Sequence, residues 1–371
     1  MAQRDLVALF TPISIKGLQI KNRIVMAPMQ LGLGFRSERA KAFYIERARG
    51  NVGAITLPAT PVDVLASDEA WGRKGALDSF LKGLSPLVAA VHQAGAKLGI
   101  QLWHGANFPA GLSGYQGEEI APSPKRKARE LKAAEIEIIV SKFASAAARA
   151  KEAGLDFVNI HGAHNYLLHR FFSPLDNKRR DKYGGSVGKR MTFALECVKA
   201  IRQAVGQDYP LFWRLSAEEE VTDGITLEQS IKLALALKEA GIDVIDVSFG
   251  RTLRRIIPSR KQPPGTYVPQ AEAIKRAVNI PVVAVGRINS PQLAEDIIAQ
   301  GKADLVAIGR QLIADPQWAR KAWEGRYNDI VFCDSCNRNC VSFVPEIIKP
   351  LVSLESPFCR LNERAGKEWI A

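Results

Sequence analysis

Three side chains that can bind or transfer protons lie within six residues of one another: His161, His164 and Tyr166. They follow an apolar run of the kind that forms a buried strand. Imidazoles can donate hydrogen bonds to a carbonyl or carboxylate oxygen, and a phenol can deliver a proton, although its ordinary pKa of about 10 makes it a weak acid. A single histidine here would be read as a core residue, with an interface tyrosine beside it. The three together favour a reactive site.

Two Gly-Arg pairs end two later apolar runs, at Gly286-Arg287 and Gly309-Arg310. A glycine lets the backbone N–H approach a phosphate closely, and the arginine adds a charge-assisted hydrogen bond. Either pair alone could be a tight turn followed by a surface arginine. Their repetition favours a phosphate site shared by two strand ends.

Four of the five cysteines lie in the last forty residues, at Cys333, Cys336, Cys340 and Cys359, whereas Cys197 is isolated. This distribution is typical of a metal site rather than of a disulfide framework. Four thiolates bind either an iron–sulfur cluster or zinc, and the spacing alone leaves both open.

Short apolar strands that alternate with amphipathic helices are expected to position these groups. The expected strands are residues 24–29, 54–59, 98–103, 157–162, 211–217, 244–250, 282–286 and 305–310. The expected helices are residues 134–153, 187–205, 227–240, 270–277, 291–300 and 316–324. Strands that are apolar almost throughout are buried on both faces, as in parallel sheets. The alternation predicts an α/β fold, a (β/α)8 TIM barrel, with a doubly wound sheet as the competing architecture.

In such a barrel the active site lies at the C-terminal ends of the strands, where the groups above fall. Residues 105–133 contain several glycines and prolines and are expected to form a loop over the barrel mouth. Ser290-Pro291 and Asp315-Pro316 are expected to begin two helices. The barrel pattern stops near residue 325. We therefore predict a barrel of residues 1–325 and a Cys-rich extension of residues 326–371 packed on it.

The whole chain has ordinary globular composition, with 371 residues, 47% hydrophobic, and a net charge of +13. No apolar run reaches the roughly 18 residues of a membrane span, and the first residues lack the apolar core of a secretory signal. We therefore expect a cytoplasmic protein with no membrane contact. The basic balance favours anionic partners. Basic clusters such as Lys125-Arg126-Lys127 and Lys178-Arg179-Arg180 have no interleaved aromatic residues, so nucleic acid is not expected. A homo-oligomer is expected.

Residues 160–190, IHGAHNYLLHRFFSPLDNKRRDKYGGSVGKR, resemble the Old Yellow Enzyme family of flavin oxidoreductases. The resemblance extends to LFTPISIKGLQIKNRIVMAPM at 9–29, QLWHGA at 101–106, WRLSAEE at 213–219, VAVGRI at 283–288 and AIGRQLIADP at 307–316. It covers essentially the whole barrel and implies FMN at the C-terminal ends of the strands.

The resemblance also implies which residues contact the flavin ring. The segment that would lie under the ring is Ala27, Pro28, Met29 and Gln30. Gln30 stands where many relatives carry Thr, Cys or His, which would alter the flavin potential. Gln101 corresponds to the glutamine that bonds the pyrimidine edge. Arg214 corresponds to the arginine beside N1 and O2, where a positive charge stabilises the anionic reduced ring.

The same resemblance implies a phosphate cradle and a catalytic trio. The cradle residues would be Gly286, Arg287, Gly309 and Arg310. His161 and His164 correspond to the pair that anchors an activated carbonyl, and Tyr166 to the proton donor. Reduced FMN would pass hydride to the β-carbon of an activated alkene while Tyr166 protonates the α-carbon. The implied substrate is a small unsaturated compound, with CoA thioesters among the candidates.

The cysteine tail resembles the [4Fe–4S] motif of the 2,4-dienoyl-CoA reductase and trimethylamine dehydrogenase branch, although the gap before Cys359 is longer than usual. The resemblance favours an iron–sulfur cluster over zinc. Larger relatives continue into an FAD- and NAD(P)H-binding domain, and no GxGxxG follows a strand here. We therefore expect electrons from a ferredoxin or a separate flavoprotein, or from NAD(P)H.

The loop after the sixth strand is strongly basic, with Arg251, Arg254, Arg255, Arg260 and Lys261. These residues are expected either to meet an acidic electron carrier or the phosphates of CoA, or to form a solvated lid.

Two other functions stay open. An amine or N-methyl dehydrogenase of the trimethylamine type would need an aromatic cage for a cation, and the second strand ends instead in Pro58-Ala59-Thr60-Pro61. An electron-relay subunit without substrate chemistry would have no need of the His161, His164 and Tyr166 trio.

Overall fold

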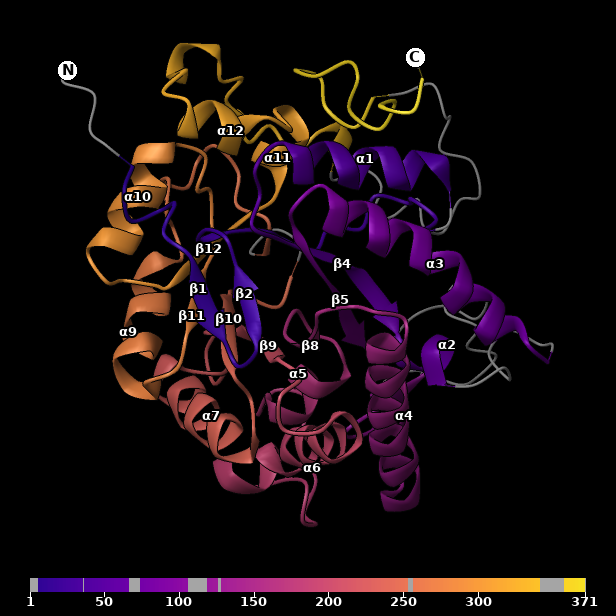
Figure 1. The fold of residues 1–371 in the computed structure, drawn as a ribbon. Coiled ribbons are helices and arrows are strands. Elements are labelled where there is room, and N and C mark those ends of the chain that lie inside the picture. Colours follow the sequence, from indigo (N-terminus) through magenta and orange to yellow (C-terminus); the bar gives the residue numbers. More distant parts are fainter. Residues whose placement is uncertain are drawn as a thin grey trace.

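The computed structural model describes residues 6–35, 37–66, 74–105, 119–125, 128–252, 256–340 and 357–370. Its centre is a closed barrel of eight parallel strands (Figure 1). In spatial order they are β10 (Val244–Ser248), β11 (Val282–Ala284), β12 (Leu305–Ile308), β3 (Ile24–Met26), β4 (Ala54–Pro61), β5 (Lys97–Trp103), β8 (Phe157–Gly162) and β9 (Leu211–Ser216), which pairs again with β10. This confirms the predicted (β/α)8 TIM barrel and excludes the doubly wound sheet.

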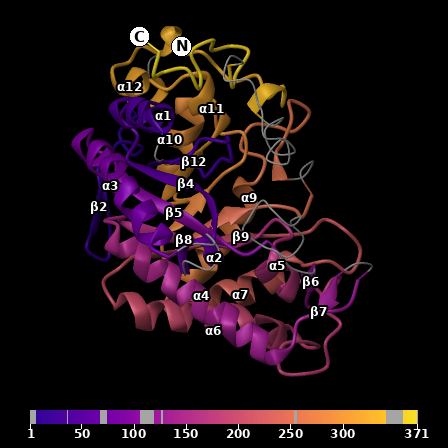
Figure 2. The same ribbon diagram turned by 90° about the vertical axis from the view of Figure 1, so that its right-hand side faces the viewer.

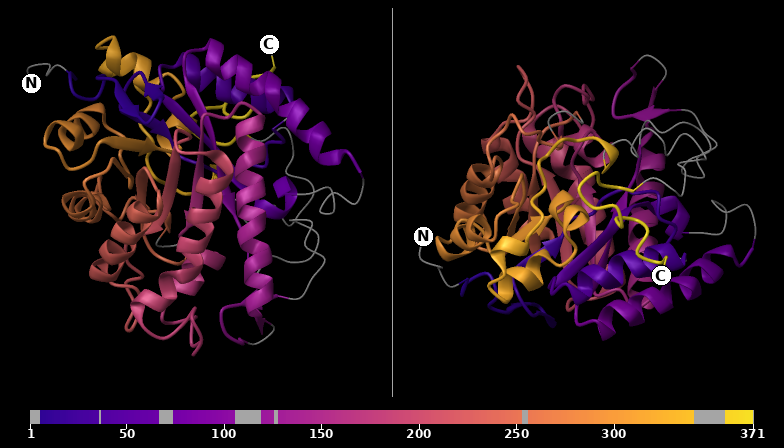
Figure 3. Two further views of the ribbon diagram at one scale, coloured as in Figure 1. Left: turned by 60° about the horizontal axis from the view of Figure 1, so that its bottom comes forward. Right: turned by 90° about the horizontal axis from the view of Figure 1, so that it is seen from above.

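Helices surround the barrel and cover the outer face of its strands (Figure 3). The longer ones are α1 (Glu38–Arg49), α3 (Ala76–Gln93), α4 (Ala133–Glu152), α6 (Val187–Val205), α7 (Leu227–Ala240), α9 (Val268–Val278) and α10 (Pro291–Ala299), and the short α12 (Trp318–Trp323) comes after them in the chain. Short helices α2 (Val62–Ala66), α5 (Leu167–Phe172) and α11 (Arg310–Ala314) follow strand ends. Small accessory elements are β6 (Ile120–Ala121), β7 (Arg129–Glu130) and η2 (Tyr327–Asp329). In the described part of the chain, no helix combines the length and apolarity that crossing a bilayer requires.

The two faces of each strand have different neighbours, and this decides where the polar groups go. Side chains alternate across a strand, so Val158 and Ile160 pack outward against helices while Phe157, Asn159 and His161 share the inner face. The inward side chains are apolar near the N-terminal ends of the strands. There they form one cluster with the antiparallel hairpin of β1 (Ile13–Ile15) and β2 (Leu18–Ile20). The hairpin therefore closes the barrel at the N-terminal ends of its strands, and the polar inward side chains lie toward the C-terminal ends.

The predicted strands are all present, but most end earlier than expected. β12 stops at Ile308 instead of residue 310, and β3 stops at Met26 instead of residue 29. The last residues of these runs leave the sheet to line the mouth of the barrel, which their composition alone does not reveal. β4 is longer than expected and has a register shift between Leu57 and Ala59. The loop expected at 105–133 contains β6 and β7, and its residues 106–118 lie outside the described residues.

The helix predictions match the bounds of α6 and α7, lie within one residue of those of α4 and α10, and are shorter than α9. Ser290 caps α10 through its side chain with Pro291 in the first turn, as predicted. The helix expected to begin at Asp315-Pro316 begins instead at Trp318, because the Asp315 side chain accepts from the Gln317 N–H in a turn that precedes the helix. No helix was predicted at α1, which follows β3, or at α3, which follows β4 and α2.

Residues 357–370 pack against α1 and α11 at one end of the molecule, where Figures 1 and 2 show the yellow C-terminal segment. A buried ion pair anchors it: Arg47 of α1 donates to the Glu368 carboxylate at 2.7 Å, with side-chain exposures of 0% and 3%. The Phe358 ring lies 6.0 Å from that of Phe43, centroid to centroid. These contacts hold Cys359, which lies between Phe358 and Asn362 in the sequence, close to α1 and α11.

Candidate active site

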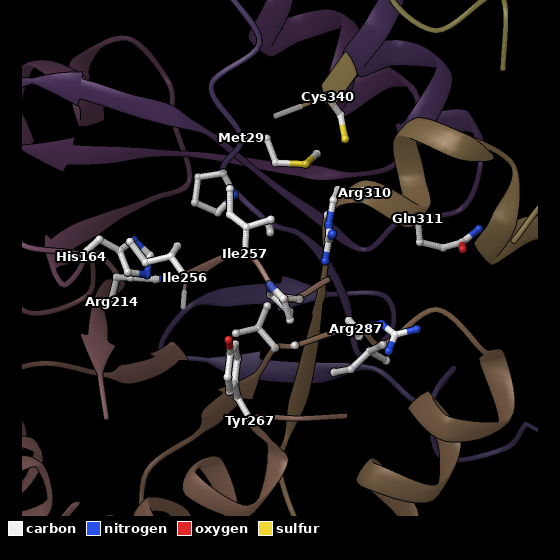
Figure 4. A pocket seen from close by; sticks show the side chains of 18 of the residues that line it. Met29, His164, Arg214, Ile256, Ile257, Tyr267, Arg287, Arg310, Gln311 and Cys340 are labelled. Carbon is white, nitrogen blue, oxygen red and sulfur yellow. The ribbon is translucent and has the colours of Figure 1, made fainter. Parts of the chain in front are cut away.

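A cavity of about 240 Å³ opens at the C-terminal ends of the barrel strands. The structure brings to it every flavin and substrate residue that the sequence predicted: Ala27, Pro28, Met29, Gln30, Gln101, His161, His164, Tyr166, Arg214, Gly286, Arg287, Gly309 and Arg310. Figure 4 shows the arrangement, with His164 and Arg214 at one end and Arg287 and Arg310 at the other. We call these the histidine end and the arginine end.

At the histidine end, His161 contacts both other members of the predicted catalytic trio. The ring of His161 lies 4.9 Å from that of His164 and 4.7 Å from that of Tyr166, measured between centroids. Trp103 packs on the other side of Tyr166 at 4.5 Å. His164 and Asn165 have φ values of 61° and 65°, a left-handed backbone that side chains other than glycine rarely adopt. This turn places both imidazoles over the same part of the cavity.

A chain of buried hydrogen bonds joins the residues that the sequence predicts to hold the flavin and the substrate. Gln101 donates to Asn159 at 3.2 Å, and Asn159 donates to Asp246 at 2.9 Å. Arg214 reaches both Asp246 oxygens at 2.9 and 2.8 Å. The Ser248 hydroxyl then lies 3.3 Å from Arg214 and 2.7 Å from the Nε2 of His164.

Sequence reasoning missed Asn159, Asp246 and Ser248. Each is a polar residue in an apolar strand, in VNIH of β8 and VIDVS of β10. One signal could have found them: a polar residue inside an apolar strand, level with a predicted site residue on another strand of the barrel. It also missed Ile256, Ile257, Pro258 and Tyr267, which give the cavity an apolar wall.

The electrostatics at the histidine end favour neutral imidazoles and a protonated phenol. Burial, with Arg214 nearby, holds the pKa of His161 well below its ordinary value. Burial and the neighbouring His161 do the same to the pKa of His164. Burial raises the pKa of Tyr166. Two neutral hydrogen-bonding rings therefore stand beside a phenol that keeps its proton at neutral pH.

Two polar atoms at this end lack a partner in the described part of the chain, namely the buried Nδ1 of His161 and Nε of Arg214. Buried polar atoms in proteins are almost always hydrogen-bonded. Because both residues line the cavity, a ligand with acceptor atoms would satisfy them, as a flavin pyrimidine and a substrate carbonyl would.

The arginine end fits an anion. Among the described residues neither Arg287 nor Arg310 has a carboxylate partner, and the nearby charge of Arg310 helps to lower the pKa of Arg287, after burial. Gly286 has φ of 116°, and a Cβ there would lie 2.8 Å from the Tyr267 ring. Only glycine therefore lets the backbone pass between Tyr267 and the cavity. Two uncompensated cations beside an open backbone suit the phosphate of FMN.

The four clustered cysteines line a second, small cavity, together with Arg310. Cys333, Cys340 and Arg310 also line the first cavity, so the two are adjacent. All four thiols are free, and no described group of His, Cys, Asp or Glu is close enough together to hold a single metal ion. A cubane cluster separates its ligand sulfurs more widely than a single ion does, so four thiols around one cavity remain compatible with it.

The predicted basic surface is only partly a surface. Arg251 is partly buried and bonds the buried Asp176 at 2.6 Å, with Glu219 at 3.4 Å, so its charge is compensated within the protein. Arg179 is likewise buried and bonds Asp181 and two backbone carbonyls. Arg260 and Lys261 are exposed. Arg126, Lys127, Arg254 and Arg255 lie outside the described residues.

Acid should destabilise the protein through its buried histidines. Besides the catalytic pair, burial lowers the pKa of His104 to about 4 and that of His169 to about 4. A histidine whose pKa is lower in the folded than in the unfolded chain binds its proton more readily when unfolded. The histidines' contribution to the free energy of unfolding should therefore be greatest above pH ~6.5. It should decrease as the pH falls toward ~4, by up to about 1.4 kcal/mol per pH unit for each histidine.

Urea unfolding between pH ~7 and pH ~5 measures this slope. The Asn165 N–H donates to the Nδ1 of His169 at 3.1 Å. The change His169→Gln removes the titrating ring and keeps a side-chain oxygen that can accept this hydrogen bond. It should flatten the slope; an identical slope in the variant would exclude His169 as a contributor.

Comparison with known proteins agrees with this geometry. The sequence profile of the NADH:flavin oxidoreductase / NADH oxidase family matches residues 8–329. An NADH oxidase of Thermoanaerobacter brockii is 44% identical over 98% of this chain and 57% of its own. Two solved structures superpose on nearly the whole chain. The structure of 2-naphthoyl-CoA reductase has a TM-score of 0.84 and 30% identity, and the match covers 99% of this chain and 58% of that one. The structure of histamine dehydrogenase from Rhizobium sp. 4-9 has a TM-score of 0.85 and 28% identity, and the match covers 98% of this chain and 53% of that one.

This chain thus spans just over half the length of each of these relatives. The matched region contains the eight barrel strands, both Gly-Arg pairs and the residues His161, His164 and Tyr166. The chain belongs to the NADH:flavin oxidoreductase / NADH oxidase family, and its barrel is that of a flavin-dependent oxidoreductase.

Proposed function

We propose that this protein reduces the activated C=C bond of an α,β-unsaturated carbonyl compound, with FMN as the hydride carrier and Tyr166 as the proton donor. The observation that carries the proposal is the histidine end of the cavity: two neutral imidazoles and a protonated phenol in contact, above Arg214. FMN, when bound and reduced, supplies a hydride for the β-carbon.

The residues of the chain divide the remaining work. His161 and His164 hydrogen-bond the substrate carbonyl and stabilise the negative charge that develops on its oxygen. Tyr166, held between Trp103 and His161, delivers a proton to the α-carbon. Gln101 and Arg214 hold the flavin pyrimidine, and Arg287 and Arg310 hold its phosphate. Ile256, Ile257 and Pro258 give this space an apolar wall.

We include CoA thioesters in the proposed substrate class, because the 2-naphthoyl-CoA reductase is similar over the whole chain. Amine oxidation is the second candidate, because the histamine dehydrogenase is equally similar. The cavity disfavours it: its described lining contains Arg214, Arg287 and Arg310 and no carboxylate, and its aromatic residues are Tyr166 and Tyr267. A cationic amine at the histidine end would meet Arg214 and no carboxylate, and the described lining offers it no aromatic cage.

Anaerobic half-reactions distinguish the two candidates. We expect a simple cyclic enone to reoxidise the reduced flavin of the purified protein, and histamine or trimethylamine to leave the oxidised flavin unchanged. Bleaching of the oxidised flavin by an amine, with no reoxidation by enones, would overturn the proposal in favour of amine oxidation. A flavin that responds to neither class would favour an electron-relay role.

For the cysteine tail we propose a [4Fe–4S] cluster held by Cys333, Cys336, Cys340 and Cys359. The support is a set of four free thiols around one cavity that shares Cys333, Cys340 and Arg310 with the flavin cavity. A cluster there would pass single electrons between the flavin and a ferredoxin or flavoprotein partner. If the cysteines hold no cluster, NAD(P)H would reduce the flavin directly. If they hold zinc, the tail would have a structural role.

Metal and flavin analysis of anaerobically purified protein tests this assignment. We expect about four iron and four sulfide per chain, and zinc in their place would exclude the cluster. The variant Cys359→Ser should lose iron and keep flavin, because Cys359 lines only the second cavity. Cys197→Ala, in the buried face of α6, is the matched control and should keep both. Full iron content in Cys359→Ser would remove Cys359 from the ligand set.

A further inference from the structure

Both arginines at the arginine end are held by residues 333–340, which carry three of the four clustered cysteines and which we call the cysteine segment. The Nε of Arg287 donates to the Ser335 hydroxyl at 3.1 Å. The Nη1 of Arg310 donates to the side-chain oxygen of Asn337. Ser335 and Asn337 stand on either side of Cys336, and each is more than twenty residues from its arginine in the sequence. The cysteine segment therefore contacts the flavin site through its non-cysteine side chains.

The backbone of this segment has an uncommon conformation. Ser335 and Asn337 have φ values of 55° and 52°, the left-handed region that costs a residue with a Cβ about 1 kcal/mol or more. Such a conformation persists only where surrounding contacts hold it. Here the Cys333 N–H donates to Gln311 at 2.8 Å, and the Asn337 amide also donates to the Ile257 carbonyl in the cavity wall at 3.3 Å. Ser335 is 3% exposed.

The chemistry of the two acceptors matters. Arg287 and Arg310 are close enough to repel each other, and their long side chains would otherwise sample many rotamers. A carboxylate would orient them but would also neutralise their charge. A hydroxyl and an amide oxygen orient the guanidinium groups and leave both positive charges for an anion.

We propose that Ser335 and Asn337 are positioning residues for the flavin phosphate: they fix the Arg287 and Arg310 side chains toward it and thereby couple the conformation of the cysteine segment to FMN retention. The inference rests on the proposed phosphate position at the arginine end. By thermodynamic reciprocity, a ligand that orders this segment tightens FMN binding, and FMN orders the segment in return.

Paired affinities for FMN and riboflavin test the inference, since riboflavin has the same ring and no phosphate. The full chain is freed of flavin and titrated with each, and quenching of flavin fluorescence gives the dissociation constant. Ser335→Ala and Asn337→Ala should each weaken FMN binding about tenfold, equivalent to about 1.4 kcal/mol. Riboflavin binding should change by less than about twofold. Asn339→Ala is the matched control, because Asn339 donates within the tail, to the Pro357 carbonyl at 3.1 Å, and should preserve both affinities.

The alternative outcomes are distinct. Equal weakening of FMN and riboflavin, unchanged FMN binding, or the same loss in Asn339→Ala would each overturn the inference, the first and last by pointing to general disruption of the segment. Arg287→Ala separates it from the assignment beneath it. If Arg287→Ala leaves the FMN-to-riboflavin ratio unchanged, the phosphate lies elsewhere and the inference falls with it. If Arg287→Ala lowers the ratio and the Ser335 and Asn337 variants do not, only the inference is wrong.

Discussion

Replacing Tyr166 with phenylalanine should slow the reoxidation of the reduced flavin by an enone about 10²- to 10⁴-fold, the range that a positioned general acid contributes. The change removes one hydroxyl and keeps the ring. Since the contacts to His161 at 4.7 Å and to Trp103 at 4.5 Å are contacts of the ring, the cavity should keep its shape. Burial keeps the phenol protonated at neutral pH, and a phenylalanine has no proton to give.

Reduction of the flavin should proceed at the wild-type rate in the same variant, because no proton from Tyr166 enters that step. Anaerobic stopped-flow measurement of the two half-reactions separates them. Tyr209→Phe is the matched control, since its hydroxyl donates to the Leu155 carbonyl at 3.0 Å as part of the core rather than of the cavity. Unchanged reoxidation in Tyr166→Phe would assign the proton to another donor, such as solvent, and leave Tyr166 a role in packing.

The barrel could be predicted from the sequence because burial on both faces leaves a mark on composition. Strands such as Phe157–Gly162 and Leu211–Ser216 are buried at every position, and their apolar runs show it. The site followed from the same fact, since parallel strands in a barrel bring their C-terminal ends together. Residues as distant in sequence as Met29 and Arg310 therefore had to meet at one mouth.

What the sequence did not reveal depends on contacts between distant segments. Asp246 interrupts an apolar strand, but only the closed barrel shows that it faces Arg214 and Asn159. The bonds from Arg287 to Ser335 and from Arg47 to Glu368 span 48 and 321 residues, in segments with no periodic pattern. Arg251 was misread as a surface cation because its acidic partners, Asp176 and Glu219, also lie in other segments of the chain. No local rule pairs such residues.

Replacing Arg214 with methionine should have the second large effect, on both stability and flavin potential. Arg214 and Asp246 form a buried ion pair with side-chain exposures of 8% and 5%. Removing one partner leaves a buried charge uncompensated and typically costs about 3–5 kcal/mol. The same change removes the cation proposed to stabilise the anionic reduced flavin. The flavin midpoint potential should fall by on the order of 30–60 mV, since about 30 mV corresponds to 1.4 kcal/mol for two electrons.

The double variant Arg214→Met/Asp246→Asn separates the two effects. It has no unpaired buried charge, so chemical denaturation should show much of the lost free energy of unfolding restored. It still lacks the cation but has also lost the Asp246 carboxylate, so a redox titration in excess FMN should show a potential above that of the single variant and below that of the wild type. Asp246→Asn alone should raise the potential, because Arg214 keeps its charge and loses the carboxylate that bonds it at 2.8 Å. If the double variant recovers the wild-type potential along with the stability, Arg214 acts on the flavin only by keeping the barrel folded, and the charge in the cavity must come from elsewhere.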